Sequence, residues 1–289
     1  MRTLRARTAG IAQRVALALL TAWLAALASR ADQLPLWEAG PGLAVVDFPD
    51  YRGADERSTY VLPFPYIVYR GDVFRIDREG VRGRFLKSDE VELDLSVNAS
   101  IPVKSAENHA RQGMPDLDPT IEIGPTLDFT LHRGADRKSS LKLQLPLRAV
   151  MAVNLSPPRA HGVGFVFEPQ LEYDLHDLAP LSGWRFVAAA GPVFGDRSYH
   201  AYYYGVDPAF ATSQRPAYMA RAGFGGSQLT LSTSRRFPHF WVGAFARFDW
   251  LSGAVFEDSP LVRQSRAFAA GIAFSWIFAR SDTLVEADE

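Results

Sequence analysis

The stretch RAFAAGIAFSWIF, residues 266–278, alternates with a period of two. Small side chains fill most of the face that holds Ala267, Ala269 and Gly271. An extended strand with large apolar groups on one side and small groups on the other suits a wall between hydrocarbon and a crowded interior. The stretch therefore predicts one strand of a transmembrane antiparallel β-barrel in a bacterial outer membrane. The apolar face consists of Phe268, Ala270, Ile272, Phe274, Trp276 and Phe278.

The first 31 residues have the pattern of an export signal. Arginines precede the uncharged apolar run at residues 15–28, and residues 29–31 place small side chains at the two positions that a signal peptidase recognises. We expect cleavage after Ala31. The alternative, an anchoring helix, needs about 20 apolar residues, which this run does not supply.

Composition limits the partners of the mature chain. Loss of five arginines with residues 1–31 leaves 26 basic residues against 32 acidic ones, a net charge near −6. An acidic chain without a basic run is not expected to bind nucleic acid. The chain has no Cys, so stability must come from a large core or a closed sheet.

Alternation continues through the rest of the chain, which we expect to be all-β. Residues 32–278 are predicted to form one barrel of about twelve strands, with ten as the alternative, and residues 279–289 a disordered acidic tail. A strand of 12 residues tilted by roughly 45° spans about 28 Å, enough to cross the apolar band. The expected strands cover residues 37–48, 59–70, 72–77, 81–87, 90–102, 119–132, 139–154, 161–174, 183–194, 219–234, 239–251 and 266–278.

The connections predict an orientation. Outer-membrane barrels have short periplasmic turns and longer outer loops, and the longest expected gaps fall on every second connection, with 155–160 as a short exception. Both ends of the barrel should therefore lie in the periplasm. A soluble β-sandwich is the alternative, but its strands are commonly about 5 or 6 residues long. Aromatic residues near the expected strand ends would form the interfacial girdle: Trp37, Tyr69, Trp184, Tyr218, Trp241, Trp250 and Trp276.

Several strings of residues, in order along the mature chain, resemble the MipA/OmpV family of Gram-negative outer-membrane proteins. The resemblance implies a non-enzymatic outer-membrane scaffold that brings a lytic murein transglycosylase to a peptidoglycan synthase. A porin for small solutes and a surface adhesin are the alternatives within the family. The strings are LPLWEAGPGLAVVDFPDYRG (residues 34–53), YVLPFPYIVYRGD (60–72), GMPDLDPTIEIGPTL (113–127), YYYGVDP (202–208), RFPHFWVGAFARFD (236–249) and VFEDSPLV (255–262).

One expected outer loop stands out. Tyrosines beside a histidine could stack on sugar rings or pack against a partner, and they could equally fold inward to plug the barrel. These candidate recognition residues are Tyr199, His200, Tyr202, Tyr203 and Tyr204.

Polar residues at interior-facing positions carry both signs of charge. Cross-pairing would close a narrow interior, whereas a porin needs unpaired charge around an open constriction. The candidate lining residues are Glu92, Asp94, Glu122, Asp128, Lys142, Arg148, Glu168, Glu172, Asp174, Arg185, Arg247 and Asp249.

No motif for catalysis, a cofactor or a metal emerges. The six histidines fit no catalytic pattern that we can match, and GxSxG, HExxH and the Walker sequence are absent. Asp116 and Asp118 offer two carboxylates where calcium needs six to eight oxygens, so a capped turn is expected there. Pro63 and Pro65 predict an irregular stretch or bulge, and the glycines of residues 223–226 a bend or bulge.

Overall fold

The structure is a computed structural model, which describes residues 33–71, 74–77, 80–83, 86–88, 90–155, 157–178 and 181–286. The predicted signal segment, residues 1–31, lies outside the described residues. The chain divides into two compact units, and the larger comprises residues 37–280. Among the described residues, no helix is both long and apolar enough to cross a membrane.

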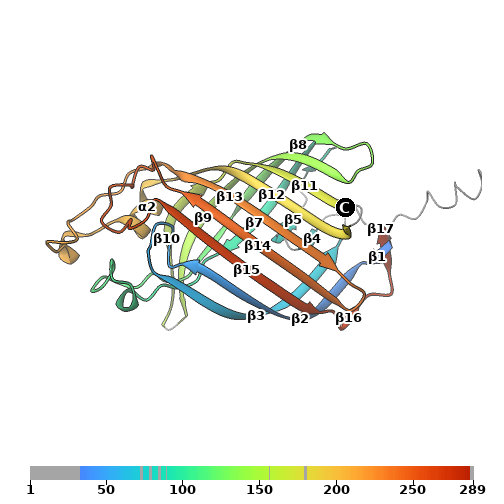
Figure 1. Cartoon of the computed structure of the whole chain (residues 1–289), viewed down its shortest axis with the longest axis horizontal. Helices are drawn as coiled ribbons and strands as arrows, with labels where there is room; N and C mark the ends of the chain where they lie inside the picture. Colours follow the sequence, from blue (N-terminus) through green and yellow to red (C-terminus); the bar gives the residue numbers. More distant parts are fainter. Residues whose placement is uncertain are drawn as a thin grey trace, which may run out of the picture. The chain divides into compact units, whose positions relative to one another are not determined.

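The larger unit is built on a single sheet of antiparallel strands (Figure 1). This confirms the all-β prediction. The strands are β2 (Trp37–Pro49), β3 (Arg57–Arg70), β4 (Phe74–Asp77), β5 (Gly80–Gly83), β6 (Leu86–Lys87), β7 (Val91–Ala99), β8 (Thr120–Arg133), β9 (Ser139–Leu155), β10 (Pro158–Phe167), β11 (Gln170–Leu178), β12 (Leu181–Gly195), β13 (Gly223–Arg236), β14 (Phe240–Trp250), β15 (Arg266–Trp276) and β16 (Ala279–Arg280).

Neighbours in the chain are almost always neighbours in the sheet. The order runs β5-β4-β3-β2-β15-β14-β13-β12-β10-β9-β8-β7-β6. Strands β10 and β11 both pair with β9 and with β12, so they act as one strand interrupted at residues 168–169. The predicted bulge near residues 223–226 is confirmed, because the β12–β13 register shifts there.

The two faces of β15 are those that the alternation predicts. Ile272, Phe274 and Trp276 are well exposed on the convex side, whereas Ala269 and Ser275 are buried on the opposite side. The strand therefore has an apolar outer face and a small-residue inner face, as a membrane wall requires.

The aromatic girdle is only partly as expected. Trp37, Trp250 and Trp276 are exposed. The prediction for Trp241 is wrong, because its ring lies on the inner face, 5.9 Å from that of Tyr66. The alternation places Trp241 inside, since exposed Phe248 and Trp250 occupy the other parity of β14.

The prediction of a bulge at Pro63 and Pro65 is wrong. Strand β3 pairs with β2 without a shift, and Pro65 lies opposite Pro41. Prolines fit there because their nitrogens point away from the β2–β3 ladder. Among the described residues, β3 pairs with β4 only at Tyr69 and Arg70, so the edge beyond Pro63 and Pro65 needs no amide donor.

Long connections gather at one end of this unit. They are residues 50–56, 100–119, 196–222 and 251–265, and the β9–β10 turn at the same end is short. The opposite end has short connections, such as 134–138 and 237–239, and strand β2 begins there. Figure 1 shows the long loops together beside α2 (Arg197–Tyr204).

The C-terminal segment contains more pairing than a disordered tail would have. Strand β16 continues the edge of β15 and pairs with β2 at Ala39 and Glu38. The described part of the smaller unit contains β1 (Gln33–Pro35) and β17 (Leu284–Glu286), which pair antiparallel. Pairing in a ladder gives hydrogen-bond partners to backbone N–H and C=O groups. This explains why the polar C-terminal segment forms β16 and β17.

Candidate functional site: a loop cap and a polar interior

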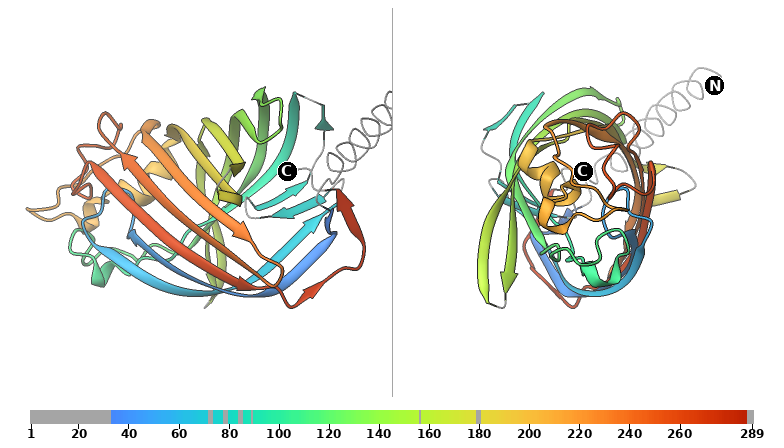
Figure 2. Two further views of the ribbon diagram at one scale, coloured as in Figure 1. Left: turned by 45° about the vertical axis from the view of Figure 1, so that its right-hand side comes forward. Right: turned by 90° about the vertical axis from the view of Figure 1, so that its left-hand side faces the viewer.

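The four long loops of the larger unit pack into one structure, which we call the cap: residues 50–56, 100–119, 196–222 and 251–265. The cap contains α2 and the short helices η1 (Ser105–Glu107) and η2 (Pro208–Phe210). In the right-hand view of Figure 2, α2 lies on the concave side of the sheet, within the curve of the strands. The cap therefore lies across the end of the sheet's interior.

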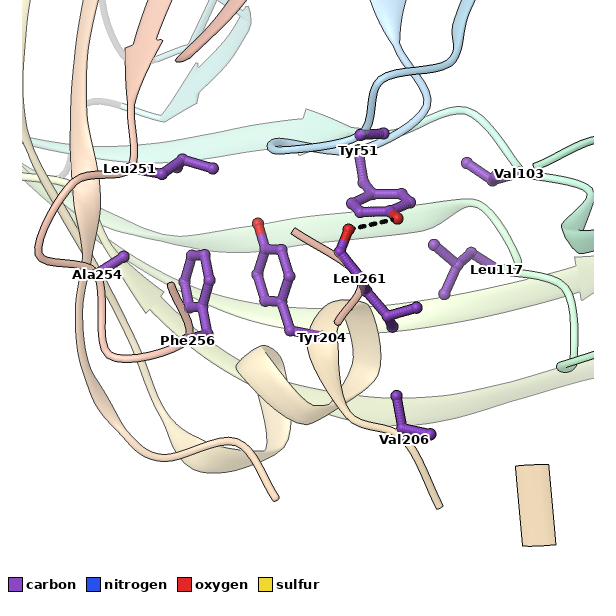
Figure 3. Close-up of a cluster of buried hydrophobic side chains, with 10 residues drawn as sticks. Tyr51, Val103, Leu117, Tyr204, Val206, Leu251, Ala254, Phe256 and Leu261 are labelled. Atoms are coloured by element: carbon purple, nitrogen blue, oxygen red, sulfur yellow. Dashed lines mark hydrogen bonds between the residues drawn. The ribbon is translucent and has the colours of Figure 1, made fainter. Parts of the chain in front are cut away.

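A hydrophobic core of its own holds the cap together (Figure 3). The ring of Tyr204 stacks on that of Phe256 with centroids 3.6 Å apart. The Tyr51 hydroxyl donates a 2.8 Å hydrogen bond to the carbonyl of Leu261. Such a core among loops is unusual, because connecting segments normally carry few buried contacts. Its buried members are Tyr51, Ala54, Val103, Leu117, Tyr204, Val206, Leu251, Ala254, Phe256 and Leu261.

Two buried arginines join the loops through backbone carbonyls. The Arg111 guanidinium donates to the carbonyls of Tyr203 and Pro115, each at 3.2 Å. Arg215 donates to the carbonyls of Ala110 at 3.0 Å and Gln112 at 2.9 Å. The bonds to Tyr203, Ala110 and Gln112 cross between the 100–119 and 196–222 loops, and all four bonds satisfy acceptors that have no ladder partner.

The predicted recognition tyrosines all contribute to the cap. His200 and Tyr204 are buried, and Tyr199, Tyr202 and Tyr203 are half-buried. The Tyr202 hydroxyl donates to the carbonyl of Asp118 at 2.8 Å, and the Tyr204 hydroxyl donates to that of Arg52 at 3.0 Å. The structure therefore brings these five residues together on the inward side, the arrangement of the plug alternative.

Helix α2 is seated on the wall at Gly164. The Asp196 side chain caps the helix by accepting a 2.7 Å bond from the amide of Tyr199. Gly164 has φ +134°, and a Cβ there would lie 2.2 Å from the Asp196 Oδ1 atom. Only glycine permits this backbone and this close approach. Strand β10 bulges beside it, which brings the wall against the helix.

His200 is enclosed between the helix and the wall. Its Nδ1 atom lies 2.7 Å from the carbonyl of Arg221 and therefore carries the proton that it donates. A Cβ built on Gly195 or Gly225 would lie 2.5 Å or 3.0 Å from its Nε2 atom. Burial lowers the pKa of His200, and the nearby Arg52 charge lowers it further, so the ring is held neutral.

We expect the cap to loosen in acid. Histidine in an unfolded segment has a pKa near 6.5. Because the pKa of His200 is lower in the folded cap, the unfolded segment binds more protons than the folded cap when the pH falls below about 6.5. Cap stability is therefore full above pH 6.5 and falls as the pH drops from there toward the folded pKa. Amide exchange of residues 197–204, corrected for the chemical rate, should accelerate by up to about tenfold from pH 7.5 to pH 5.5. In His200→Asn this acceleration should be absent, and an equal acceleration in both proteins would contradict the assignment.

An ion-pair cluster ties the cap to the wall. Asp249 on β14 is fully buried and accepts from Arg52 Nε at 2.8 Å and from Arg247 Nε at 3.1 Å. Arg52 belongs to the 50–56 loop, and sequence reasoning missed it. No local pattern marks Arg52, because its partner lies 197 positions away.

Asp249→Asn should destabilise the protein strongly. The change removes the carboxylate that neutralises Arg52 and Arg247, and breaking a buried pair costs roughly 3–5 kcal/mol. Urea unfolding followed by tryptophan fluorescence would measure it. Asp258→Asn, at an exposed acid of the cap, is the matched control and should stay within about 0.5 kcal/mol. Equal effects of the two changes would contradict the cluster's role.

Further ion pairs cross the polar interior. Arg148 lies between Glu168 at 2.6 Å and Glu122 at 3.7 Å. Arg185 pairs with Asp174 at 2.5 Å. At the end away from the cap, a cluster that the sequence did not reveal joins buried Glu38 to Arg236 and Arg70.

An interior cavity of about 470 Å³ lies among these groups. Of the predicted lining residues, Asp94, Asp128, Arg148, Glu172 and Arg185 line it. Glu92 on β7 and Lys142 on β9 are half-buried. The remaining predicted residues form the ion pairs described above: Glu122, Glu168, Asp174, Arg247 and Asp249.

The two acids of the possible calcium loop serve as hydrogen-bond acceptors within the cap. Asp116 accepts a 2.7 Å bond from the amide of Ser105, and Asp118 accepts a 2.9 Å bond from the side chain of Asn154. Within the described ranges, no group of three or more His, Asp or Glu side chains is placed to hold a metal ion.

Comparisons with known proteins identify the family. Residues 42–278 match the family described as MltA-interacting protein MipA. Outer membrane protein OmpV of Vibrio cholerae is 23% identical over 216 residues, covering 73% of this chain and 76% of OmpV. The outer membrane protein OprD of Pseudomonas aeruginosa aligns over 84% of this chain and 95% of its own, with TM-score 0.30 and 7% identity. A mutant of the monoaromatic hydrocarbon channel TodX aligns over 84% of this chain and 90% of its own, with TM-score 0.28 and 10% identity. This chain belongs to the MltA-interacting protein MipA family and is an outer-membrane protein.

Proposed function

We propose that this protein is a closed outer-membrane barrel, shut by its own cap, that anchors peptidoglycan-remodelling enzymes at its periplasmic end. The observation that carries the proposal is the cap's buried core, which fastens four loops across the interior. The proposed partners are a lytic murein transglycosylase and a peptidoglycan synthase. The protein itself has no catalytic role in this proposal.

Chain continuity supports closure of the barrel. The hydrogen-bonded order begins at β5 and ends at β6. These strands are consecutive in the sequence. Gly83 ends β5 and Leu86 begins β6, so their Cα atoms can be at most about 11 Å apart. The chain therefore keeps the two edges of the sheet close to each other at this point, which supports closure.

The distribution of loops supports the orientation. Outer-membrane barrels place long loops outside and short turns in the periplasm, so the cap faces outward and the start of β2 faces the periplasm. The exposed apolar side chains of β15 lie between these ends and face lipid. In this orientation, the outer face of the sheet contacts outer-membrane lipid.

Closure of the mouth favours an anchor over an open pore. Opening a path through the cap would expose the Tyr204–Phe256 stack and break the Arg52–Asp249 pair. Each loss destabilises by a few kcal/mol. An open channel instead needs an uninterrupted polar path.

The periplasmic end offers a docking surface. The turn at residues 134–138 is joined to the end of β11 by Lys138, whose Nζ atom lies 3.1 Å from Asp177 Oδ2 and 3.2 Å from the Asp177 carbonyl. The family description names an interaction with another protein. We propose that such a contact is made at this end of the larger unit, around the turn at residues 134–138.

Single cysteines can test the docking surface, because the natural chain has none. Ala135→Cys in a turn and Ser213→Cys in the cap are both at exposed positions. After maleimide–benzophenone labelling and illumination in cells, we expect a murein hydrolase adduct from Ala135→Cys and none from Ser213→Cys. Absence of any murein-enzyme adduct from the turn, or the same adduct from both positions, would overturn the scaffold.

A solute channel is the second candidate, and the interior cavity favours it. A volume of about 470 Å³ with both signs of charge could hold a small polar solute. This function requires the cap to move. Planar-bilayer recording separates the two, since a channel gives discrete conductance steps and a capped anchor stays silent.

A further inference from the structure

A groove of about 380 Å³ lies on the larger unit at the cap end of strands β3, β14 and β15. Its lining shares no residue with the cap's buried core or with the interior cavity. Its lining includes Arg57, Arg266, Phe248, Trp250 and Phe268. This combination of guanidinium groups and aromatic rings calls for a ligand with both charge and apolar surface.

The aromatic part of the groove faces outward, toward lipid, whereas Asp249 and Ala267 of its lining are buried. Phe248, Trp250 and Phe268 are 36%, 39% and 41% exposed, and they share the parity of the lipid-facing residues on their strands. Phe248 packs against Phe268 with ring centroids 5.0 Å apart. Exposed aromatic rings at a strand end mark the level of lipid headgroups.

Charged side chains occur on this outer face, which is otherwise apolar. Arg57 reaches across β2 and donates a 2.7 Å bond to the carbonyl of Phe268 on β15. Its Nε atom lies 3.1 Å from Asp47 Oδ1. The guanidinium is therefore held against the wall by these contacts, although the side chain remains 37% exposed. Charges on a lipid face are costly in mid-membrane and tolerated only near the interface.

The groove's charge balance is positive. Arg266 opens β15 on the exposed face, and its register partner is Trp250. Asp47 is the acid that faces Arg57, whereas the carboxylate of Asp249 is engaged with Arg52 and Arg247 on the inner side. Asp249 is also among the residues that line the groove, but its charge is balanced by Arg52 and Arg247, so the two guanidiniums of the groove face one further carboxylate and favour an anion.

We propose that this groove binds the phosphate of a phosphorylated glycolipid of the outer leaflet. Arg57 and Arg266 would contact the phosphate oxygens, for which the planar guanidinium is suited. The aromatic rings would pack against the sugar and the first acyl carbons. The inference rests on the orientation proposed above, in which the cap end faces outward.

Native mass spectrometry of the delipidated full chain in detergent can test the site, with bis-phosphorylated lipid A as the probe. Arg57→Gln/Arg266→Gln should weaken binding at least about tenfold, the effect of losing a charge-assisted bond to phosphate. Arg57→Lys/Arg266→Lys should retain most of the affinity. Arg159→Gln/Arg221→Gln removes two exposed cap-end arginines that do not line the groove, and should bind like the natural chain.

Two further arms identify the source of the anion. Phosphatidylglycerol and inorganic phosphate should each compete poorly with lipid A. Equal competition by either would overturn the glycolipid assignment, as would unchanged binding by the glutamine variant or an equal loss in the control pair. Arg266→Gln alone, which leaves the Arg57–Asp47 pair in place, should also weaken binding, and its failure to do so would count against the site.

Failure here can be told apart from failure of the proposed function. Heat-modifiable gel migration reports whether each variant forms the barrel, and bilayer recording reports whether the cap stays shut. A folded, silent protein without lipid A binding would overturn the groove and leave the anchor standing. A natural chain that conducts and also binds lipid A would overturn the anchor and leave the groove standing.

Discussion

Tyr204→Ala should conduct ions in a bilayer, whereas the natural chain, closed by its cap as proposed, should be silent. The change removes the 3.6 Å stack on Phe256 and the hydroxyl bond to the Arg52 carbonyl. Truncating a buried aromatic residue costs roughly 3–5 kcal/mol, and the cap carries this loss because its core is separate from the strand ladder. Planar-bilayer recording should then show discrete conductance steps.

Tyr204→Phe is the matched control. It keeps the ring and loses only the hydroxyl, at a cost of about 0.5–1.5 kcal/mol, so it should remain silent. Both variants should keep the heat-modifiable migration of a folded barrel. If Tyr204→Ala is folded and silent, and its cap amides exchange as slowly as in the natural chain, the stack does not hold the cap shut.

Gly164→Ala should displace α2 from the wall. A methyl group would overlap Asp196 Oδ1 at 2.2 Å and the amide nitrogen of Tyr199 at 2.6 Å, in a backbone with φ +134°. Strain of this kind costs about 1–3 kcal/mol, and loss of the helix cap adds about 1 kcal/mol. We expect faster amide exchange across residues 196–204 and a lower urea midpoint.

Gly162 provides the control within the same strand. A Cβ there meets nothing within 4 Å, so Gly162→Ala should leave both exchange and the urea midpoint nearly unchanged. A Gly164→Ala variant that behaves like Gly162→Ala would show that the close approach at Gly164 is not required for seating the helix.

The wall could be predicted from the sequence because its signal is local. Alternation in residues 266–278 already separates the exposed Ile272 from the buried Ala269. On β14 the same kind of alternation places Trp241 on the inner face. The girdle prediction considered only how near an aromatic residue lies to a strand end, and it therefore included Trp241. Pro63 and Pro65 looked irregular only because the sequence does not show which edge of a strand is open.

The cap could not be predicted in the same way. Tyr51 bonds to Leu261 across 210 positions, and Arg52 to Asp249 across 197. No periodicity links such residues, since loops lack the repeat that reveals a strand. The tyrosines of residues 199–204 marked the segment as important, but stacking on an outside ligand and packing on Phe256 require the same side chains.

Planar-bilayer recording of the unaltered, correctly folded protein tests the central claim most directly. A barrel closed by its own cap should insert and remain silent at neutral pH. Discrete conductance steps from the natural chain under these conditions would contradict the account.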